Sequence, residues 1–419
     1  MGGHAALRPL GRRRDRVPEL EPAPRLLALP ARRAGSREGL PRAAARVADP
    51  LRRGVLRLPA GPEPGDPARA GAAAPARLRR ELARGQARPA GAPRSLEEFF
   101  VARFGRRLYE TFFKSYTEKV WGRPCAAIGA QWGAQRVKAL SVLSALRPAR
   151  AERFLYPRRG PGQLWEEAAR RVEAAGGEIR LGVRVTRVEY DGARVTAVQA
   201  GERVPCDVFV STMPVRDLLA GMTGPVPAPA REAAAALEYR DFLTVGLLVD
   251  ELAGGPVPDN WIYVHSPEVR LGRIQVYNNW SEGMIADPSK IWLGLEYFCA
   301  EGDALWNRSD EELAALGAGE LRTLGLLAAD APVRAAKVLR VPKAYPAYWG
   351  GYERFAAVRE FVDGVPNLIL IGRNGMHRYN NQDHSMLSAM AAVEHLVRGG
   401  SKAALWAVNA GDEHVEARA

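Results

Sequence analysis

The sequence predicts an α/β protein that has a second, β-rich region, a helical segment and a disordered N-terminus. Residues 163–175 repeat apolar positions with the period of a helix, and strand-like runs follow them. An apolar run at 367–372 leads through a Gly-rich turn into another helical pattern. Residues 1–95 differ in composition from everything after them. Helices and strands that alternate along one chain form a layered α/β architecture.

Residues 1–95 contain 21 Arg, no Lys and 8 acidic residues, and they lack Phe, Tyr and Trp. Such a segment cannot bury enough apolar area to offset its chain entropy, so we expect residues 1–94 to be a disordered Ala/Arg/Pro-rich region. A transit peptide is an alternative, but Ser36 and Ser95 are its only serines. Another hypothesis is that the segment is GC-rich DNA read out of frame; it predicts a βαβ pattern in the upstream DNA or in another frame.

The formal charge of +13 lies entirely in residues 1–95, since residues 96–419 hold 39 of the 60 basic and 39 of the 47 acidic side chains. A nucleic-acid-binding module is therefore not expected. The three Cys residues form no CxxC pattern, so the sequence indicates neither a metal site nor a disulfide framework. No apolar run is long enough to span a membrane, and no signal-peptide pattern is present, which predicts a cytoplasmic protein.

The first ordered region is expected at 95–150. Ser95 and Glu98 form a capping-box pattern, and aromatic residues then recur at helical spacing, which predicts helices over 96–147. A helix at 163–175 that ends at Gly176-Gly177 follows, with strands at "EIRL" and "VRVTRVEY". Asp191-Gly192 predicts a hairpin to "ARVTAVQ", and "CDVFVSTMP" reads as a buried strand.

Residues 235–345 alternate strand-like runs with loops, and a helix is expected at 310–327. The strand-like runs are "FLTVGLLV", "NWIYVHS", "RIQVYNNW" and "WLGLEYFC". "NLILIG" at 367–372 reads as a buried strand, and the last helix is expected to begin near Asp383–Ser385 and to end at Gly399-Gly400.

The junction "GRNGMHRYNNQDHSM", Gly372 to Met386, gathers many hydrogen-bonding side chains between that strand and that helix. Open α/β sheets bind ligands beyond the carboxyl ends of their strands. A helix N-terminus favours negative charge by about 0.3–1 kcal/mol, and glycines such as Gly372 and Gly375 let the backbone approach a flat ligand. The junction therefore suits an anionic ring edge, such as that of a reduced flavin.

These residues resemble a known family. Residues 96–419 are similar to the FAD-dependent amine oxidase and protoporphyrinogen oxidase superfamily, in the branch near UDP-galactopyranose mutase. The similar stretches are "FFKSYTEKVWG", "FLYPRRGPGQLWE", "VTRVEYDGARVTAV", "CDVFVSTMP", "YRDFLTVGLLV", "DNWIYVHSPEVRLGRIQVYNNW", "LGLEYFC" and the junction. The family's GxGxxG, which cradles a pyrophosphate after the first strand, is absent, so the resemblance implies an incomplete FAD-binding Rossmann-like domain.

The resemblance also implies roles for the segments. Residues 95–150 are the helical part of a substrate region, 151–215 and 346–419 are parts of the FAD-binding domain, and 216–345 are the substrate domain. It implies no particular catalytic residue. The residues expected to bind FAD are Val185, Thr212, Gly372, Arg373, Gly375, Arg378, Tyr379, Asp383, His384, Ser385 and Met386. Those expected to contact a small-molecule substrate are Arg273, Tyr277, Trp280 and Tyr345.

Each assignment has a structural alternative. The aromatic residues at 261–280 can simply pack in a core, Glu296 can be a buried structural acid, and Asp383 can be a plain helix cap. A metal at Asp383 with His377 and His384 is disfavoured, because no further His or Cys is suitably spaced.

Three functions remain open. The first is an oxidoreductase in which a hydride passes to flavin N5. The second is an isomerase of a nucleotide sugar that uses reduced flavin, like the mutase, for which paired arginines would bind a diphosphate. The third is a truncated, cofactor-free product without activity.

Overall fold

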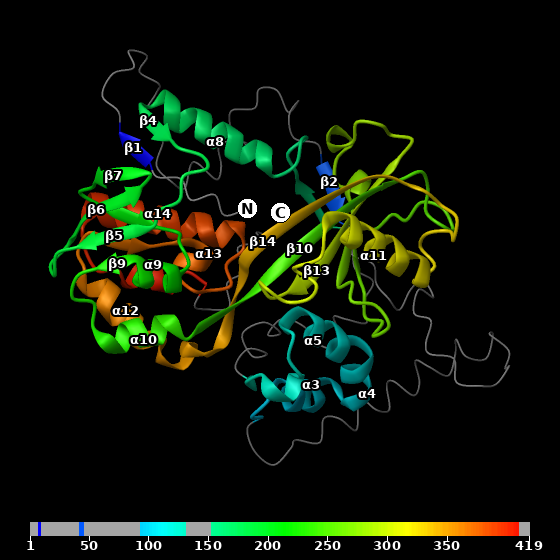
Figure 1. The fold of residues 1–419 in the computed structure, drawn as a ribbon, viewed down its shortest axis with the longest axis horizontal. Coiled ribbons are helices and arrows are strands. Elements are labelled where there is room, and N and C mark those ends of the chain that lie inside the picture. The colour runs from blue at the N-terminus through cyan, green and yellow to red at the C-terminus, as the bar shows by residue number, and fades with distance from the viewer. Residues whose placement is uncertain (1–6, 10–41, 46–92, 131–151, 410–419) are drawn as a thin grey trace. The chain divides into compact units, whose positions relative to one another are not determined.

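The computed structural model describes residues 7–9, 42–45, 93–130 and 152–409, which are coloured in Figure 1. The expected disorder of the N-terminal region and the expected helix at 131–147 fall mainly outside these residues. Unit 1 comprises residues 1–39, 161–241 and 341–419, and unit 2 comprises residues 40–160 and 242–340. The expected boundaries were 150/151, 215/216 and 345/346, whereas the units change at 160/161, 241/242 and 340/341. The last two changes fall within the long strands β10 and β14, which continue from one unit into the other.

Unit 1 combines a four-stranded sheet of order β7-β6-β5-β9 with a parallel pair, β15-β8. A further short pair joins β1 (Leu7–Pro9) to β4 (Gly177–Ile179). The remaining strands are β5 (Arg187–Tyr190), β6 (Val195–Ala200), β7 (Glu202–Pro205), β8 (Phe209–Ser211), β9 (Met222–Thr223) and β15 (Leu368–Leu370). The helices are α8 (Gly162–Ala174), α9 (Val215–Gly221), α10 (Ala228–Ala235), α12 (Phe355–Gly364), α13 (Gly372–Gly375), α14 (Gln382–Arg398) and α15 (Ala403–Ala407).

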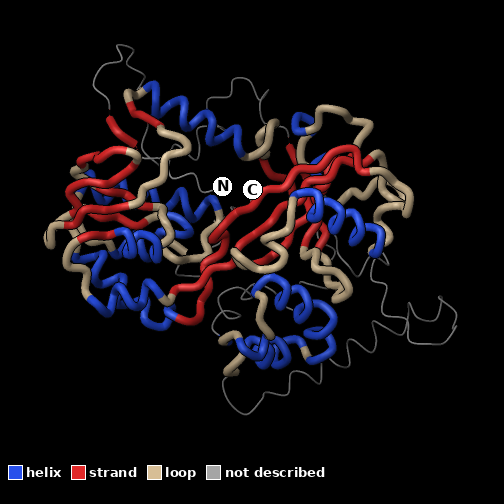
Figure 2. The backbone as a smooth tube through the Cα atoms, viewed as in Figure 1, coloured by secondary structure: helices blue, strands red, loops and turns tan. Residues whose placement is uncertain are grey.

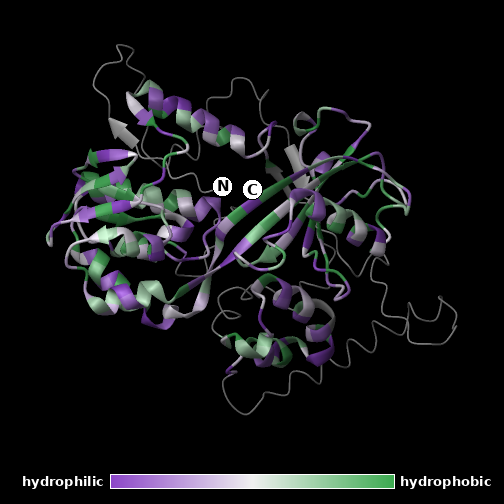
Figure 3. Ribbon diagram, in the orientation of Figure 1, coloured by the Kyte–Doolittle hydropathy of each residue, from purple (hydrophilic) through white to green (hydrophobic). Residues whose placement is uncertain are grey.

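The helix predicted at 163–175 and the hairpin at Asp191-Gly192 are both confirmed. Helix α8 is mostly hydrophilic along its length (Figure 3), as befits a helix with no fully buried residue. Asp191 Oδ1 accepts hydrogen bonds from the backbone N–H groups of Ala193 and Arg194, both at 2.8 Å, and so closes the turn between β5 and β6. Strand β5 begins only at Arg187, four residues later than the sequence pattern indicates.

The parallel pair brings together the two segments that the sequence predicts to contact a cofactor. The register places Leu370 of β15 opposite Ser211 of β8, and the three residues of β15 are buried as predicted. The prediction of a buried strand at 206–214 was wrong in one respect, because Val208 and Val210 are 41% and 40% exposed. Successive side chains of a strand point to opposite faces, and the described residues cover only the face that carries Phe209 and Ser211.

Unit 2 is built on a sheet of order β11-β12-β13-β10-β14, whose long central strands stand out in Figure 2. Its strands are β10 (Leu237–Val249), β11 (Trp261–Tyr263), β12 (Arg273–Val276), β13 (Ile291–Cys299) and β14 (Val333–Gly350), with β2 (Arg42–Ala45) paired to β3 (Glu152–Leu155). Its helices are α3 (Leu96–Phe104), α4 (Arg106–Leu108), η1 (Tyr109–Lys114), α5 (Ser115–Trp121), η2 (Cys125–Ala127), η3 (Tyr277–Asn279), η4 (Glu282–Met284) and α11 (Asp310–Thr323). Strands β10 and β14 continue into unit 1, where η5 (Gly351–Arg354) follows β14.

The 18-residue strand β14 was not predicted. Its sequence contains Pro342 and Pro346, and its first half is largely exposed and rich in Ala, Lys and Arg, so it lacks the alternation of a half-buried strand. Proline is tolerated in edge strands, and β14 lies at the edge of the sheet. Its position is therefore decided by pairing with β10 rather than by local propensity.

Each unit contains a lysine whose ammonium group donates to three backbone carbonyls. In unit 2, Lys119 Nζ lies 3.2, 2.7 and 2.9 Å from the carbonyl oxygens of Val264, Ser266 and Leu271. In unit 1, Lys402 Nζ donates in the same way to the carbonyls of Val362, Val365 and Leu368. Burial lowers the pKa of Lys119 to about 8 and also lowers the pKa of Lys402. Lys402 thus ties the end of α12 to the start of β15.

The capping pattern at 95–98 forms with a one-residue shift. Ser95 Oγ accepts the N–H of Glu98 at 3.2 Å, but the Glu98 carboxylate accepts the N–H of Arg94, at 2.7 Å, rather than that of Ser95. Over the described ranges, no helix is both long and apolar enough to cross a membrane. The same residues contain no group of three or more His, Cys, Asp or Glu side chains arranged to hold a metal.

Candidate functional site

The junction between β15 and α14 is shaped by two glycines of α13. Gly372 has a φ of +76°, and its N–H donates to Ser388 Oγ at 2.9 Å. A Cβ atom at Gly375 would lie 2.5 Å from the carbonyl oxygen of Ser211, closer than real Cβ atoms come. The turn after β15 therefore packs against the end of β8, and a side chain at position 375 would force them apart.

Helix α14 begins at Gln382 with Asn381 as its N-cap, so the alternative that Asp383 is the helix cap was wrong. Asp383 instead lies in the first turn, where a carboxylate is favoured by the helix dipole. Its Oδ1 lies 3.1 Å from Nδ1 of His384, which is 3% exposed. Ser385 Oγ donates back to the Asn381 carbonyl at 3.0 Å, and Met386 is half-buried on the next turn.

The loop from Arg373 to Tyr379 is hydrogen-bonded to residues 343–348 of β14, which we call the docking segment. Asn374 Nδ2 donates to the Lys343 carbonyl at 2.9 Å, and Arg373 Nη1 donates to the Ala344 carbonyl at 3.0 Å. A little further on, His377 Nε2 lies 2.9 Å from the Ala347 carbonyl oxygen, and the Tyr379 N–H donates to the Tyr348 hydroxyl at 2.6 Å. The conformation of the loop thus depends on an edge strand distant in sequence.

Arg373, Tyr345 and Tyr379 form a compact cluster. The Arg373 guanidinium lies 5.1 Å from the ring centroid of Tyr345 and 4.8 Å from that of Tyr379, and the two rings stack at 5.4 Å. Arg373 Nε also donates to the Asn380 carbonyl at 2.7 Å. Among the described residues no carboxylate forms an ion pair with Arg373, so its hydrogen-bond partners are neutral and its charge is not cancelled.

Arg378 binds the chain that follows α15. Its Nη1 donates to the carbonyls of Trp406 and Val408, at 2.7 and 2.6 Å. Asn409 Nδ2 donates to the Tyr379 carbonyl at 3.1 Å, which ties the same chain to the loop. Arg378 and Trp406 also border a cavity of about 270 Å³, whose other lining residues are Tyr352, Phe355, Ala356, Arg359 and Met376.

His377 is the most constrained residue of the loop. It is 1% exposed and has a φ of +44°, which is rare for residues with a side chain. Its ring meets that of Tyr239 edge-on at 4.9 Å. Burial lowers the pKa of His377 to about 4, the Ala347 carbonyl acts against this, and the charge of Arg216 adds to it. The imidazole is therefore neutral near pH 7 and serves as a packed, hydrogen-bonded support.

Of the two remaining predicted cofactor residues, Thr212 lies beside this loop and Val185 lies apart from it. Thr212 is exposed directly after β8, and its Cγ2 lies 3.7 Å from where a Cβ of Gly372 would be. Val185 precedes β5, and its side chain is buried in the apolar core of unit 1. The side chain of Val185 is thus committed to packing, and only its backbone can serve a ligand.

The four predicted substrate residues fall into two groups. Tyr345 belongs to unit 1 with Arg373, whereas Arg273, Tyr277 and Trp280 belong to unit 2. Arg273 forms an ion pair with Glu296, which is 2% exposed and also accepts a hydrogen bond from Gln275. The Arg273 guanidinium lies 6.0 Å from the ring centroid of Trp261 and 5.5 Å from that of Phe298. Glu296 is thus the buried acid that the sequence suggested, and its partner is a predicted substrate residue.

The aromatic residues of unit 2 pack closely around this pair. Trp280 is 8% exposed and lies 5.0 Å from Trp261 and 5.1 Å from Tyr156, measured between ring centroids. The Tyr277 hydroxyl lies 2.4 Å from where a Cβ of Gly294 would be, so the tyrosine fills the space above that glycine. Burial, with the charge of Glu296, raises the pKa of Tyr277 to about 12. These side chains form a packed aromatic cluster.

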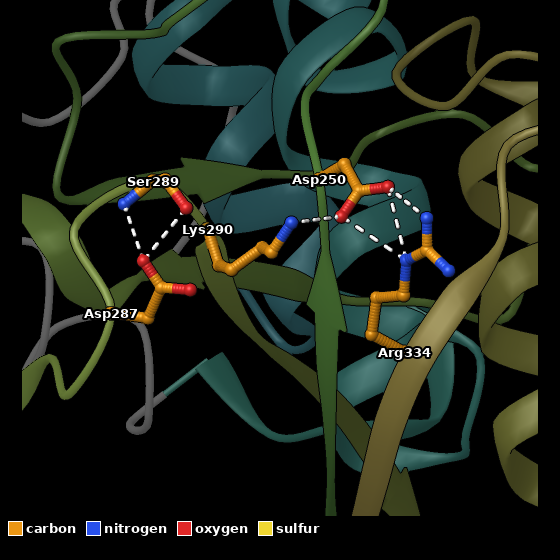
Figure 4. Close-up of polar contacts among 5 residues, drawn as sticks. All are labelled: Asp250, Asp287, Ser289, Lys290 and Arg334. Atoms are coloured by element: carbon orange, nitrogen blue, oxygen red, sulfur yellow. Dashed lines mark hydrogen bonds and ion pairs between the residues drawn. The ribbon is translucent and has the colours of Figure 1, made fainter.

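A second cavity, of about 330 Å³, lies in unit 2 beside Asp250. Figure 4 shows Lys290 and Arg334 converging on the Asp250 carboxylate, at 2.6 and 2.7 Å, while Asp287 accepts from the neighbouring Ser289. The two cations hold the pKa of Asp250 well below its usual range, Arg334 having the larger effect. Asp250, Lys290 and Arg334 satisfy one another's charges at the surface, so we interpret this group as a structural ion-pair cluster.

Sequence reasoning named Tyr345 as a site residue but missed the backbone of the docking segment as a part of the site. Its contribution consists mainly of backbone carbonyls, at Lys343, Ala344 and Ala347, which leave no trace in the sequence. Asn409 was missed as well. It adopts a φ of +56°. Asn takes a positive φ more readily than most residues, so the residue type was a signal for a tight turn.

Comparisons with known proteins identify the family and the fold. The family model described as flavin containing amine oxidoreductase matches residues 4–390. A phytoene dehydrogenase from Streptomyces griseus is 41% identical over 85 residues, a match that spans 20% of this chain and 17% of that protein. The match thus covers less than a fifth of that relative's length.

Solved structures show the same fold at low identity. A reduced UDP-galactopyranose mutase is 20% identical with a TM-score of 0.66, over 81% of this chain and 77% of that one. A protein described as a protoporphyrinogen oxidase, from Exiguobacterium sp. 255-15, is 18% identical with a TM-score of 0.55, over 76% and 72%. A putrescine oxidase bound to putrescine is 13% identical with a TM-score of 0.53, over 85% and 82%.

The resemblance to the flavin-dependent amine oxidase family is confirmed by the family model, and the structural matches, among them the mutase and the protoporphyrinogen oxidase, confirm the α/β fold with a second, β-rich unit. Because the family model spans most of the sequence, the chain belongs to the family of flavin-containing amine oxidoreductases.

Proposed function

We propose that this protein is an oxidoreductase that binds FAD at the 372–386 junction and removes a hydride from a small-molecule substrate. The observation that carries the proposal is the combination at one turn of a close backbone approach at Gly375, a helix N-terminus at Asn381 and the uncancelled charge of Arg373. All three favour a flat ligand with a negative edge.

The residues present fit a flavin in their chemistry. Among the described residues, the buried Asn374 Oδ1 has no hydrogen-bond partner, and the buried Asp383 Oδ1 has no hydrogen bond and lies beside Nδ1 of His384, at 3.1 Å. Buried polar atoms are normally paired, so both are suited to accept hydrogen bonds from a bound group such as a ribityl chain or a ring N–H. Arg373 and the first turn of α14 would favour the negative charge of the ring.

A bound flavin supplies the two-electron acceptor, which no protein side chain can replace. The residues of this chain then bind and orient. Arg373 is held by two carbonyls and two rings, so little conformational entropy remains for it to lose on binding a ligand. His377 stays neutral near pH 7 and keeps the loop on the docking segment without adding a charge. Tyr345 and Tyr379 offer apolar ring surface beside the guanidinium.

The alternative, an isomerase of a nucleotide sugar, is disfavoured by the environment of Arg273. That reaction needs arginines free to bind a diphosphate, whereas Arg273 is already paired with the buried Glu296. An arginine whose charge is cancelled in a packed aromatic cluster favours a substrate without phosphate. We therefore place oxidation of a small, largely apolar or amine substrate first.

An absorption titration of the purified full chain with FAD tests the cofactor assignment. We expect a bound two-band flavin spectrum and a dissociation constant in the micromolar range or tighter. Gly375→Ala is the matched variant: its methyl group would meet the Ser211 carbonyl, so binding should be lost. Gly319→Ala is the control, since a Cβ there meets nothing within 4 Å.

A protein that stays colourless with excess FAD would reject the proposal and favour the truncated, cofactor-free product. If FAD binds, anaerobic mixing with amines, and separately with nucleotide sugars, decides between the two activities. Bleaching of the flavin by amines supports the oxidoreductase. Turnover of a nucleotide sugar by the reduced protein only would establish the isomerase instead.

A further inference from the structure

The docking segment contains a backbone conformation that its sequence does not explain. Lys343 has a φ of +52°, and the other residues with positive φ that are not glycine, within the described part of the chain, are His377 and Asn409. A lysine in this region of backbone dihedrals is strained, and such a conformation persists only where surrounding contacts enforce it. The contacts of Lys343 therefore indicate what the conformation is for.

Two carboxylates from separate elements hold Lys343. Its backbone N–H donates to Asp241 Oδ1 of β10, and Asp241 is 5% exposed. Its ammonium group lies 3.0 Å from Asp217 Oδ2 in the first turn of α9. The Lys343 and Asp217 side chains are only 15% and 26% exposed, so solvent screens this ion pair incompletely. The peptide on one side of Lys343 and its side chain are thus fixed independently.

The strained residue and its neighbour Ala344 each present one carbonyl to the junction. The Lys343 carbonyl accepts from Asn374 Nδ2 at 2.9 Å, and the Ala344 carbonyl accepts from Arg373 Nη1 at 3.0 Å. The direction of the Lys343 carbonyl follows from the backbone dihedrals of Lys343 itself. A rotation of this residue to the ordinary β region would turn that carbonyl away from Asn374.

We propose that Lys343 is a positioning residue for the turn of α13: its contacts with Asp217 and Asp241 lock the positive-φ backbone of Lys343 in β14, which holds Arg373 and Asn374 in place. The inference deepens the proposed function, because it concerns the same turn, and the claim about cofactor affinity rests on that function. The claim that Lys343 orders the turn stands on contacts within unit 1 alone.

The test compares Lys343→Met with Lys337→Met in the full-length chain. Both variants remove one ammonium group from β14, but Lys337 is exposed in the other half of the strand. Hydrogen–deuterium exchange of the amides in residues 372–381 is measured without FAD, and FAD affinity is measured by absorption titration. A lost charge-assisted contact predicts a rise in exchange of about tenfold and a similar loss of FAD affinity for Lys343→Met only.

Two further variants separate positioning from a general loss of stability. Lys343→Arg keeps the cation and should restore most of the protection and affinity. Asp217→Asn should reproduce the effect of Lys343→Met, and the double variant should be no worse than either alone, since both remove one contact. A uniform rise in exchange throughout unit 1 would instead indicate global destabilisation and overturn the assignment.

The outcomes distinguish this inference from the proposed function. Unchanged exchange at 372–381 in Lys343→Met overturns the positioning role, whether or not FAD binds. Increased exchange at those residues in a protein that never binds FAD supports the positioning role and rejects the proposed function. Increased hydrogen–deuterium exchange at residues 372–381 with unaltered FAD affinity overturns the link between the conformation of Lys343 and the binding of FAD.

Discussion

Arg273 in unit 2 and Arg373 in unit 1 use the same side chain on similar aromatic surfaces to opposite effect. Each guanidinium lies within 6.0 Å of the centroids of two rings, Trp261 and Phe298 for the first, Tyr345 and Tyr379 for the second. Arg273 is paired with the buried carboxylate of Glu296, whereas Arg373 donates to backbone carbonyls.

The difference concerns net charge rather than packing. An arginine paired with a buried carboxylate contributes a neutral unit, and removal of either partner leaves an uncompensated charge. An arginine held by carbonyls keeps a positive potential that a bound anion can meet. We therefore expect the Arg273 pair to matter mainly for stability and Arg373 mainly for ligand binding.

The largest expected effect comes from Glu296→Ala. Removing one partner of a buried ion pair costs about 3–5 kcal/mol, because the charge of Arg273 is left in the aromatic cluster. Urea denaturation should show this loss in the free energy of unfolding. The control is Glu311→Ala on the exposed first turn of α11. An equal, small loss in both variants would show that the Arg273 pair is not energetically special.

The pH dependence of folding stability sharpens the comparison, because it tests a buried neutral residue of unit 1, His377. Burial lowers the pKa of His377 from 6.5 to about 4, so between these values the unfolded chain binds the proton and the folded protein does not. The stability contribution of neutral His377 is therefore complete above pH 6.5 and is lost as the pH falls towards 4. At about 1.4 kcal/mol for each tenfold change in the binding constant, the loss reaches about 3 kcal/mol.

Denaturation of the wild type and of His377→Asn at pH 4.5, 5.5 and 7 measures this effect. Asn tolerates a positive φ and does not titrate, so the variant should lose most of the pH slope in this range. His395→Asn on α14 serves as the control for the substitution of a histidine by Asn in unit 1. A variant with the wild-type slope would assign the titration to other groups.

The direct test of the comparison measures both FAD affinity and folding stability for a substitution of each arginine. Arg373→Met should weaken FAD binding by about tenfold or more, the effect of one lost charge-assisted contact. Arg273→Met should destabilise folding while leaving FAD affinity within about twofold. Binding titrations and denaturation on both variants check this. Equal losses of affinity would place both arginines at the ligand and revive the isomerase alternative.

The smallest effect is expected at the exposed counterpart of the Arg273 pair. Asp250 pairs with Lys290 and Arg334 at the surface (Figure 4), where solvent and salt screen the charges. Asp250→Asn should change the free energy of unfolding far less than Glu296→Ala does. Any loss of FAD affinity in this variant would indicate that the ion-pair cluster of unit 2 is more than structural.

Much of the local structure could be read from the sequence. The hairpin at Asp191-Gly192, the helix at 163–175 and the buried strand at 367–372 depend on short-range periodicity and turn chemistry, and they are confirmed. Strand β14 could not be read, because an edge strand with two prolines forms only where β10 offers it a partner. The same holds for the docking segment, whose contribution to the site is mainly carbonyl oxygen atoms.

The sequence by itself determined which residue types stand at the junction, among them glycines at 372 and 375 and an arginine after the first glycine, whereas the cap of α14 is Asn381 and not the Asp383 considered from sequence. It also marked Glu296 and Arg273 as residues of interest. Only the tertiary structure decided that Arg273 is neutralised and Arg373 is not, because an ion pair depends on which strands are neighbours. Side-chain identity is local, whereas the charge that a side chain presents is set by partners brought together from distant parts of the chain.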